Sequence, residues 1–132
     1  MLKLWGRLTS NRTQKVLWTL AEIGLDFDFT LASGVMGAGG HVARGNTPFG
    51  VVDTPEYRAL NPNGRIPTID DDGYVLWESN AICRYLVMQY AAQAMYGNDV
   101  RTFASATRWQ DFENNELLPP QHELVMELVR LP

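Results

Sequence analysis

The stretch that decides the fold is NPNGRIPTIDDDGYVLWES, residues 61–79. It opens on turn residues, because Pro62 restricts φ and Gly64 permits a positive φ. Residues 68–69 and 74–77 flank an Asp-Gly pair, which predicts a β-hairpin. On these residues alone the Ile66–Pro67 bond is expected to be trans, since cis is the minor isomer of X-Pro bonds.

Three consecutive aspartates, residues 70–72, occupy the predicted hairpin turn. A calcium loop needs alternate ligands and a distant glutamate, which this turn does not supply. Asp and Gly are also ordinary turn residues. We therefore expect a solvated turn here and no metal site.

The residues before this stretch predict a β-strand, a helix and a second strand. Residues 2–5 alternate ahead of Gly6, and residues 27–31 alternate between apolar and polar side chains. Between them, Ser10 or Asn11 can cap a helix that Gly24 ends. Its apolar face comprises Val16, Leu17, Leu20 and Ile23. This order predicts a βαβ unit with a parallel strand pair.

The segment 34–50 is rich in glycine and lacks apolar periodicity, so we expect a long surface loop. It has neither a P-loop ending nor a complete G-x-G-x-x-G, which disfavours phosphate binding. His41 and Arg44 lie in it, and we expect both to be exposed loop residues without a binding role. Thr54 and Pro55 then predict the cap and first position of a short helix.

After the hairpin, Ser79 is expected to cap a helix. Cys83 lies off the centre of its apolar stripe and is expected to be a small buried thiol. The stripe comprises Ala81, Ile82, Tyr85, Leu86 and Tyr90. Residues 91–100 are interpreted as a linker, and residues 101–132 as two helical segments separated at Pro119-Pro120.

Composition excludes several classes of protein. The chain has 132 residues, a net charge of −4 and no cluster of Lys and Arg, so a nucleic-acid partner is disfavoured. A single cysteine allows neither an internal disulfide nor a Cys-x-x-Cys redox pair, which favours a reducing cytoplasm. Neither a signal peptide nor an apolar run long enough to span a membrane is recognised.

The order of predicted elements, together with three motifs, resembles the cytosolic glutathione S-transferases. The motifs are Ser10 ahead of QKVLW at 14–18, NPNGRIPTI at 61–69 and ESNAICRYL at 78–86. The resemblance is to bacterial members with a serine at the active site. It implies an α/β fold: a thioredoxin-like glutathione-binding domain at 1–90, the linker at 91–100 and an incomplete all-α domain at 101–132.

The resemblance also implies roles for individual residues. In this family the bond before Pro67 is cis, and the backbone of Ile66 pairs with the cysteinyl part of glutathione like an added strand. Glu78 and Ser79 match the pair that holds the γ-glutamyl end, where a carboxylate would also suit a helix N-terminus. Arg65 is a candidate for the glycyl carboxylate.

Ser10 is the candidate catalytic residue that the resemblance implies. A hydroxyl donating to the glutathione sulfur, helped by the N-terminus of the following helix, would lower the pKa of the thiol from about 8.5 and populate the thiolate. Two alternatives stay open, namely that Ser10 only caps the helix and that Thr9 is the donor. Many relatives carry Asn two residues after the serine, whereas this chain has Arg12 there, with Asn11 one place earlier.

These implications lead to a glutathione transferase, cytoplasmic and detoxifying, with glutathione as co-substrate and a small electrophile as partner. The family continues its helical domain with further helices that line the electrophile pocket. The alternative is therefore a glutathione-binding or protein-interaction domain without turnover. Glutaredoxin-like activity is disfavoured, because no cysteine lies near residue 10. Apolar faces between Phe103 and Val129 predict a homodimer.

Overall fold

The computed structural model describes residues 1–33 and 51–130, with the side chains of 129–130 excepted. The glycine-rich segment 34–50, with His41 and Arg44, lies outside the described residues, and so do 131–132. Contacts divide the chain into two compact units, Met1–Ala91 and Ala92–Pro132. Each unit is described by itself.

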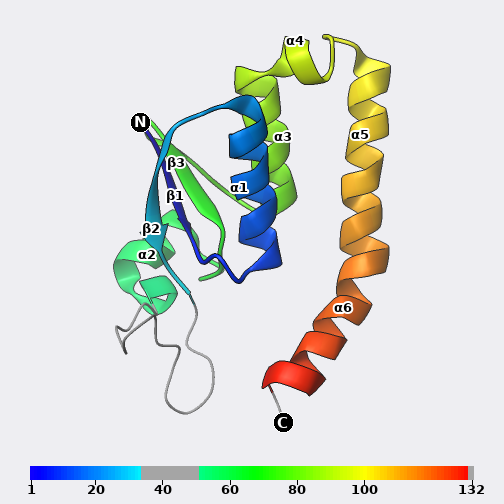
Figure 1. The fold of residues 1–132 in the computed structure, drawn as a ribbon. Coiled ribbons are helices and arrows are strands. Elements are labelled where there is room, and N and C mark those ends of the chain that lie inside the picture. Colours follow the sequence, from blue (N-terminus) through cyan, green and yellow to red (C-terminus); the bar gives the residue numbers. More distant parts are fainter. Residues whose placement is uncertain (34–50, 131–132) are drawn as a thin grey trace. The chain divides into compact units, whose positions relative to one another are not determined.

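The first unit is built on a mixed four-stranded sheet (Figure 1). β1 (Leu2–Gly6) runs parallel to β2 (Phe27–Leu31), as the predicted βαβ unit requires. β3 (Thr68–Asp71) is antiparallel both to β1 and to β4 (Tyr74–Trp77). The order across the sheet is β2-β1-β3-β4, so the two central strands are neighbours although they are far apart in the sequence.

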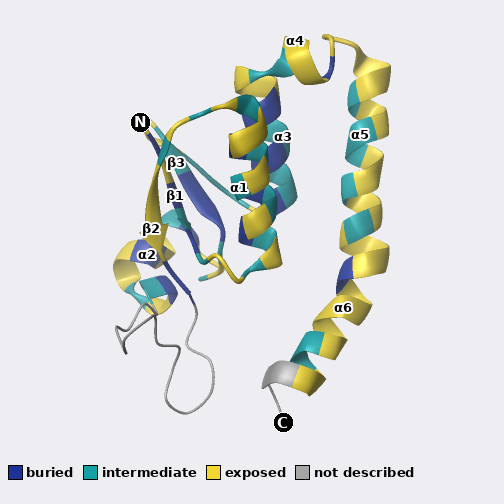
Figure 2. Cartoon of the chain, in the orientation of Figure 1, coloured by how far each residue is buried: buried dark blue, intermediate teal, exposed yellow. Residues whose placement is uncertain are grey.

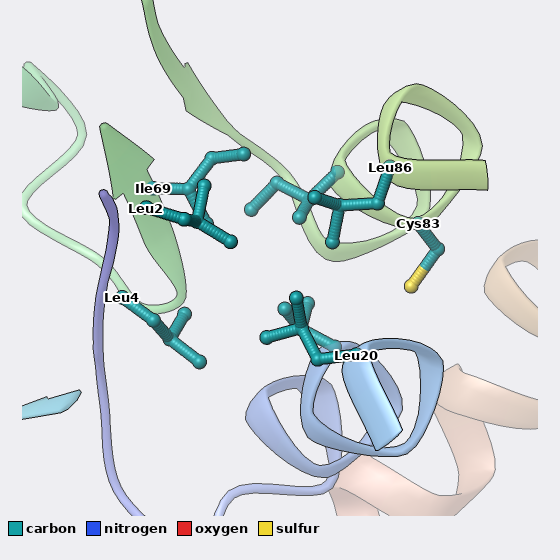
Figure 3. Packing of buried hydrophobic residues seen from close by; sticks show 8 residues of the cluster. Leu2, Leu4, Leu20, Ile69, Cys83 and Leu86 are labelled. Carbon is teal, nitrogen blue, oxygen red and sulfur yellow. The ribbon is translucent and has the colours of Figure 1, made fainter. Parts of the chain in front are cut away.

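Helices α1 (Asn11–Ile23) and α3 (Ser79–Tyr90) pack together on one face of this sheet (Figure 1). The core between helices and sheet consists of aliphatic side chains and one thiol (Figure 3): Leu2, Leu4, Val16, Leu20, Ile69, Ile82, Cys83 and Leu86. Ser10 caps α1 and Gly24 ends it in the left-handed conformation, as predicted. The predicted burial of Cys83 is likewise confirmed.

The buried stripe of α3 differs from the prediction. Val87 belongs to the buried face, whereas Tyr90, expected in the stripe, is 43% exposed. The physical reason is the phenol: Tyr85 and Tyr90 each carry a polar tip, which favours a rim position over the dry core. Both hydroxyls donate to Asp71 at the rim, at 2.7 and 2.6 Å.

Helix α2 (Pro55–Leu60) lies on the opposite face of the sheet (Figure 1). Thr54 caps it, as predicted, by accepting a hydrogen bond from the backbone N–H of Tyr57. A 3-10 turn, Val51–Asp53, precedes it. A second buried cluster forms here from Ala32, Val52 and Tyr57, with Trp5, Val51 and Ile66 packed against it.

The predicted hairpin is present, and its aspartates have structural partners. Asp72 and Gly73 take positive φ values of 49° and 95°, which suits a tight hairpin turn. Asp70 accepts a hydrogen bond from the backbone N–H of Gly73 at 2.7 Å, and Asp72 pairs with the N-terminal ammonium at 2.9 Å. With Asp71 engaged by two tyrosines, the three carboxylates stabilise the turn and its neighbours.

The second unit is helical but differs from the sequence prediction in two respects. The predicted linker contains a short helix, α4 (Ala92–Met95), and Asp99 at its end caps α5 (Val100–Phe112). The prolines do not separate two helices. A π-helical segment, Glu113–Leu117, joins α5 to α6 (Leu118–Val125), and a second one, Met126–Arg130, follows.

Two features explain why the helix continues past Pro119 and Pro120. Both prolines lie in the first turn of α6, where a missing N–H costs least. The π-helical segment before them changes the spacing of the hydrogen bonds, as π-bulges do. In the described part of the chain, no helix is long and apolar enough to cross a membrane.

Candidate active site

The pairing of the strands brings the predicted site residues together at one end of the sheet. Thr68, the first residue of β3, lies opposite Trp5 of β1 on one side and Trp77 of β4 on the other. The residues just before β3 therefore lie between the chain leaving β1 and the chain leaving β4. This end of the sheet carries Ser10, Arg65, Ile66, Pro67, Glu78 and Ser79.

Ser10 occupies the N-cap of α1. Its Oγ accepts a hydrogen bond from the backbone N–H of Thr13 at 3.3 Å, and its carbonyl accepts one from Gln14 at 2.8 Å. Ser10 therefore caps α1, as one of the two alternatives to a catalytic role requires. Capping uses only acceptor capacity, so the hydroxyl proton can still be donated. Ser10 can cap the helix and donate to a ligand at the same time.

The residues around Ser10 differ in their suitability as alternative donors. Thr9 is exposed and lies in the turn before the cap, while Ser10 is half-buried at the helix end. Asn11 and Arg12 are the first two residues of α1. Backbone N–H groups at a helix N-terminus carry a partial positive charge. Ser10 is thus closer than Thr9 to the part of the helix that favours an anion.

The position of α1 depends on close contact with β1. Thr13 lies fully buried against Gly6, where an added Cβ would come within 2.5 Å of Thr13 Cγ2. Only glycine allows this approach without displacing the helix. The contact is three residues from Ser10, so it positions the hydroxyl relative to the sheet.

The Ile66–Pro67 peptide bond is cis, the isomer that the family resemblance implies. Pro67 is buried, Ile66 is half-buried and Arg65 is exposed. Ile66 packs its side chain against the cluster that contains Tyr57. The side chain of Ile66 is therefore turned toward the protein on the α2 side of the sheet.

A buried hydrogen-bond network holds the residues before the cis bond, and sequence reasoning missed it. The carbonyl of Arg65 accepts from the Tyr57 hydroxyl at 2.7 Å and from Asn61 Nδ2 at 2.9 Å. Both donors also contact Thr68 Oγ1, at 2.8 and 3.0 Å. In the sequence Asn61 begins a run of turn residues, and its spacing of four from Tyr57 is the signal that could indicate this network.

Glu78 and Ser79 join β4 to α3, and here one prediction is wrong. Ser79 does not cap α3: it is the first helical residue, and Glu78 is the cap residue, with no side-chain capping bond. The reason is that the chain passes from strand to helix within one residue, which forces Glu78 to φ 75° and ψ 112°. A positive φ at a residue other than glycine costs free energy and is common at functional sites.

Comparison with known proteins identifies the family. The glutathione S-transferase N-terminal domain model matches residues 9–88. Glutathione S-transferase GstB of Escherichia coli is 36% identical over 134 residues, which cover the whole chain. The chain belongs to the glutathione S-transferase family.

Solved structures of glutathione S-transferases share the fold. A theta class enzyme from Xanthomonas axonopodis pv. citri, solved with glutathione bound, matches 99% of this chain at 39% identity and a TM-score of 0.81. Transferase F2 of Populus trichocarpa matches the full chain at 27% identity and a TM-score of 0.80. The thioredoxin-like fold of the first unit and the helical nature of the second agree with the family.

The chain spans only part of these relatives. It covers 58% of the Escherichia coli protein and 56% of the Xanthomonas chain. The matched glutathione S-transferase domain contains every predicted site residue from Ser10 to Ser79.

Proposed function

We propose that the chain is a glutathione transferase in which Ser10 activates the thiol of glutathione for attack on a small electrophile. The observation that carries this proposal is the meeting of a helix-capping hydroxyl, a cis-proline segment and a strained Glu-Ser pair at one end of the sheet. A bound glutathione found in the related Xanthomonas structure supports the choice of co-substrate.

In this proposal each site residue has one role. Ile66 pairs its backbone with the cysteinyl part of glutathione, as an added strand does. Glu78 accepts from the ammonium of the γ-glutamyl group, while Ser79 and the N-terminus of α3 bind its carboxylate. Arg65, whose side chain is exposed, binds the glycyl carboxylate. These contacts leave the sulfur directed toward α1.

Ser10 then acts as a donor and never as the nucleophile. The thiol loses its proton to solvent, and the thiolate accepts a hydrogen bond from Ser10 and lies in the positive field of the α1 N-terminus. The sulfur forms a bond to an electrophilic carbon, and the leaving group departs with the electron pair. With a peroxide, the sulfur instead bonds to one oxygen while the O–O bond breaks; the other oxygen leaves with the electron pair and takes a proton from solvent, and the sulfur becomes a sulfenic acid. Ser10 stabilises the charge that the sulfur carries before the attack.

The test compares the wild type with Ser10→Ala and Thr9→Ala in conjugation assays on a panel of electrophiles. A lost hydrogen bond to a charged group should lower kcat/KM of Ser10→Ala by about tenfold to a hundredfold. Its pH–rate profile should shift upward, toward the pKa of a free thiol near 8.5. Thr9→Ala, the matched control, should keep the wild-type profile.

Isothermal titration with glutathione separates this proposal from its alternative. If all three proteins bind glutathione and are equally inactive, the chain is a glutathione-binding module without turnover. This outcome is worth testing because the chain spans only 58% of the length of the Escherichia coli relative. Failure to bind glutathione at all would leave only a protein-interaction role.

The organisation of the molecule is part of the proposal. Residues 1–90 would form the glutathione-binding domain, 91–100 its connection and 101–132 a portion of the helical domain. We place the protein in the cytoplasm, in keeping with its single, buried cysteine. We also propose a homodimer, supported by large apolar side chains that remain exposed on α5 and α6.

A further inference from the structure

In the buried network around the Arg65 carbonyl, only one assignment of donors and acceptors satisfies every hydrogen bond. A carbonyl can only accept, so the single hydroxyl proton of Tyr57 goes to Arg65 at 2.7 Å. The contact of 2.8 Å between Tyr57 and Thr68 then requires Thr68 to be the donor. With its own proton used, Thr68 accepts from Asn61 Nδ2 at 3.0 Å.

The orientation of the Asn61 amide is determined independently. Its Oδ1 accepts from the backbone N–H of Asn63 at 3.0 Å, which assigns the opposite side of the amide to Nδ2. The two protons of Nδ2 then match its two acceptors, Arg65 at 2.9 Å and Thr68. Tyr57, Asn61 and Thr68 are at most 3% exposed, so a missing partner would cost the full desolvation of a polar group.

Fixing the Arg65 carbonyl also fixes the next backbone N–H. Among the described residues the only cis bond is Ile66–Pro67, so the Arg65–Ile66 peptide is trans. In a trans peptide the C=O and the N–H lie in one plane and point in opposite directions. With the Arg65 carbonyl directed into the network, the N–H of Ile66 is directed away from it.

We propose that Tyr57, Asn61 and Thr68 are positioning residues that hold the Arg65–Ile66 peptide plane, and so present the Ile66 N–H to glutathione in advance of binding. This inference rests on the proposed function for the identity of the ligand. A rigid donor avoids the entropy of ordering the loop when the tripeptide binds. The network therefore sets the affinity for glutathione, while Ser10 sets the reactivity of the sulfur.

Tyr57 is suited to this role in two further ways. Its hydroxyl holds the Arg65 carbonyl, and its ring belongs to the buried cluster against which the next residue, Ile66, packs. Burial raises the pKa of its phenol, although the bonds with Thr68 and Asn61 act in the opposite direction. Tyr57 thus keeps its proton, and remains a donor, throughout the neutral range.

The experiment uses the full chain with Tyr57→Phe and Thr68→Val, each of which removes a hydroxyl and keeps the shape of the side chain. Thr68→Ser restores the hydroxyl. Tyr85→Phe is the matched control, because it also removes a phenol hydroxyl, but one that donates to Asp71, at the opposite end of β3 from Thr68. Glutathione affinity by isothermal titration is expected to fall about fivefold to twentyfold in the first two variants and to stay near wild type in the others.

Kinetics give a second readout that a loss of general stability would not produce. With saturating glutathione, kcat of Tyr57→Phe should stay within about twofold of wild type while KM for glutathione rises. An unchanged KM with a reduced kcat would overturn the proposal. So would an equal loss of affinity in Tyr85→Phe.

A measurement without ligand separates this proposal from the proposed function. Relaxation of the Ile66 backbone amide, measured by NMR, should give an order parameter near 0.85 in the wild type and Thr68→Ser, and a lower one in Tyr57→Phe and Thr68→Val. If the order parameter falls as expected but no protein binds glutathione, the positioning role stands and the proposed ligand is wrong. An amide that is equally rigid in all variants overturns the positioning role itself.

Discussion

At the residue scale, Gly6 decides how closely α1 can approach the sheet. A Cβ at this position would lie 2.5 Å from Thr13 Cγ2 and 2.8 Å from its Oγ1. Thr13 is fully buried and β-branched, so its side chain cannot turn away easily. We expect Gly6→Ala to destabilise the fold by about 1–3 kcal/mol, as overpacking of a core does, measured by urea denaturation.

The control for this prediction is the double variant Gly6→Ala/Thr13→Ala. It removes the two nearest atoms that the new methyl would meet and leaves only Thr13 Cβ, at 3.2 Å, so it should lose less stability than the two single changes predict together. Simple additivity would show that the clash with Thr13 is not the cause. A Gly6→Ala protein as stable as the wild type would contradict the close contact itself.

Cys83 is the residue whose chemistry the fold suppresses most. It is 6% exposed in the core between α1 and α3 (Figure 3), and this burial raises the pKa of its thiol. The thiolate is the reactive form, so reaction with a disulfide reagent at pH 8 should be at least about tenfold slower in the native protein than in urea. Rapid stoichiometric labelling of the native protein would contradict this burial.

At the scale of elements, Asp71 joins the hairpin to α3 through two phenols. Its Oδ2 accepts from Tyr85 at 2.7 Å and from Tyr90 at 2.6 Å. The bond to Asp71, then partial burial, raises the pKa of Tyr90 to about 12, and partial burial followed by the same carboxylate raises that of Tyr85. Because the pKa of Tyr90 is raised in the folded state, its bond to Asp71 stabilises the fold below about pH 10, and this stabilisation is lost as the pH rises through about 12.

This linkage predicts the effect of Asp71→Asn. Without the carboxylate, the pKa values of both phenols should fall toward 10, which an ultraviolet titration of tyrosine ionisation would detect. Tyr90→Phe assigns the change to one residue. Asp72→Asn is the control: Asp72 pairs with the N-terminal ammonium, and its charge is the weakest of the influences that raise the pKa of Tyr90, so only a small fall in that pKa is expected. An unchanged titration in Asp71→Asn would show that the two bonds do not persist in solution.

At the scale of the whole molecule, much of α5 and α6 is exposed (Figure 2), and the exposed residues of the second unit include large apolar ones on α5, on α6 and in the π-helical segment Met126–Arg130. Trp109 is 62% exposed and Leu128 is 73% exposed. Such surface is uncommon on a monomer, and tryptophan is enriched among the residues that dominate interfaces. These exposures support the proposed homodimer.

Light scattering tests that proposal. The wild type should have twice the mass of one 14.9 kDa chain, and Trp109→Glu should weaken the dimer by at least about thirtyfold, as the loss of an interface hot spot does. Trp18→Glu is the matched control, because Trp18 is an exposed tryptophan of the first unit. A monodisperse wild-type monomer, or equal weakening by both variants, would contradict the proposed interface.

Much of the first unit could be predicted from its sequence because the deciding contacts are local. Ser10 and Thr54 cap helices by bonds to backbone N–H groups three residues later, and Gly24 ends α1 through its own φ. The Asp-Gly turn also acts within its own hairpin. Signals of this kind depend on a few consecutive residues, so the sequence displays them directly.

The rest depends on groups that meet only after folding. The cis geometry before Pro67 was expected from family resemblance and not from its own residues. Tyr57 and Thr68 are far enough apart in sequence that only packing of α2 against β3 brings their hydroxyls together.

The sequence by itself therefore determined the order of elements in the first unit, the caps of α1 and α2, and the candidate residues. The tertiary structure decided which polar groups share a buried site, that Glu78 takes the strained turn in place of a cap by Ser79, and that α3 buries Val87 while Tyr90 stays at the rim. The physical reason is that burial and hydrogen-bond satisfaction belong to the assembled molecule, since each depends on partners that come from other segments.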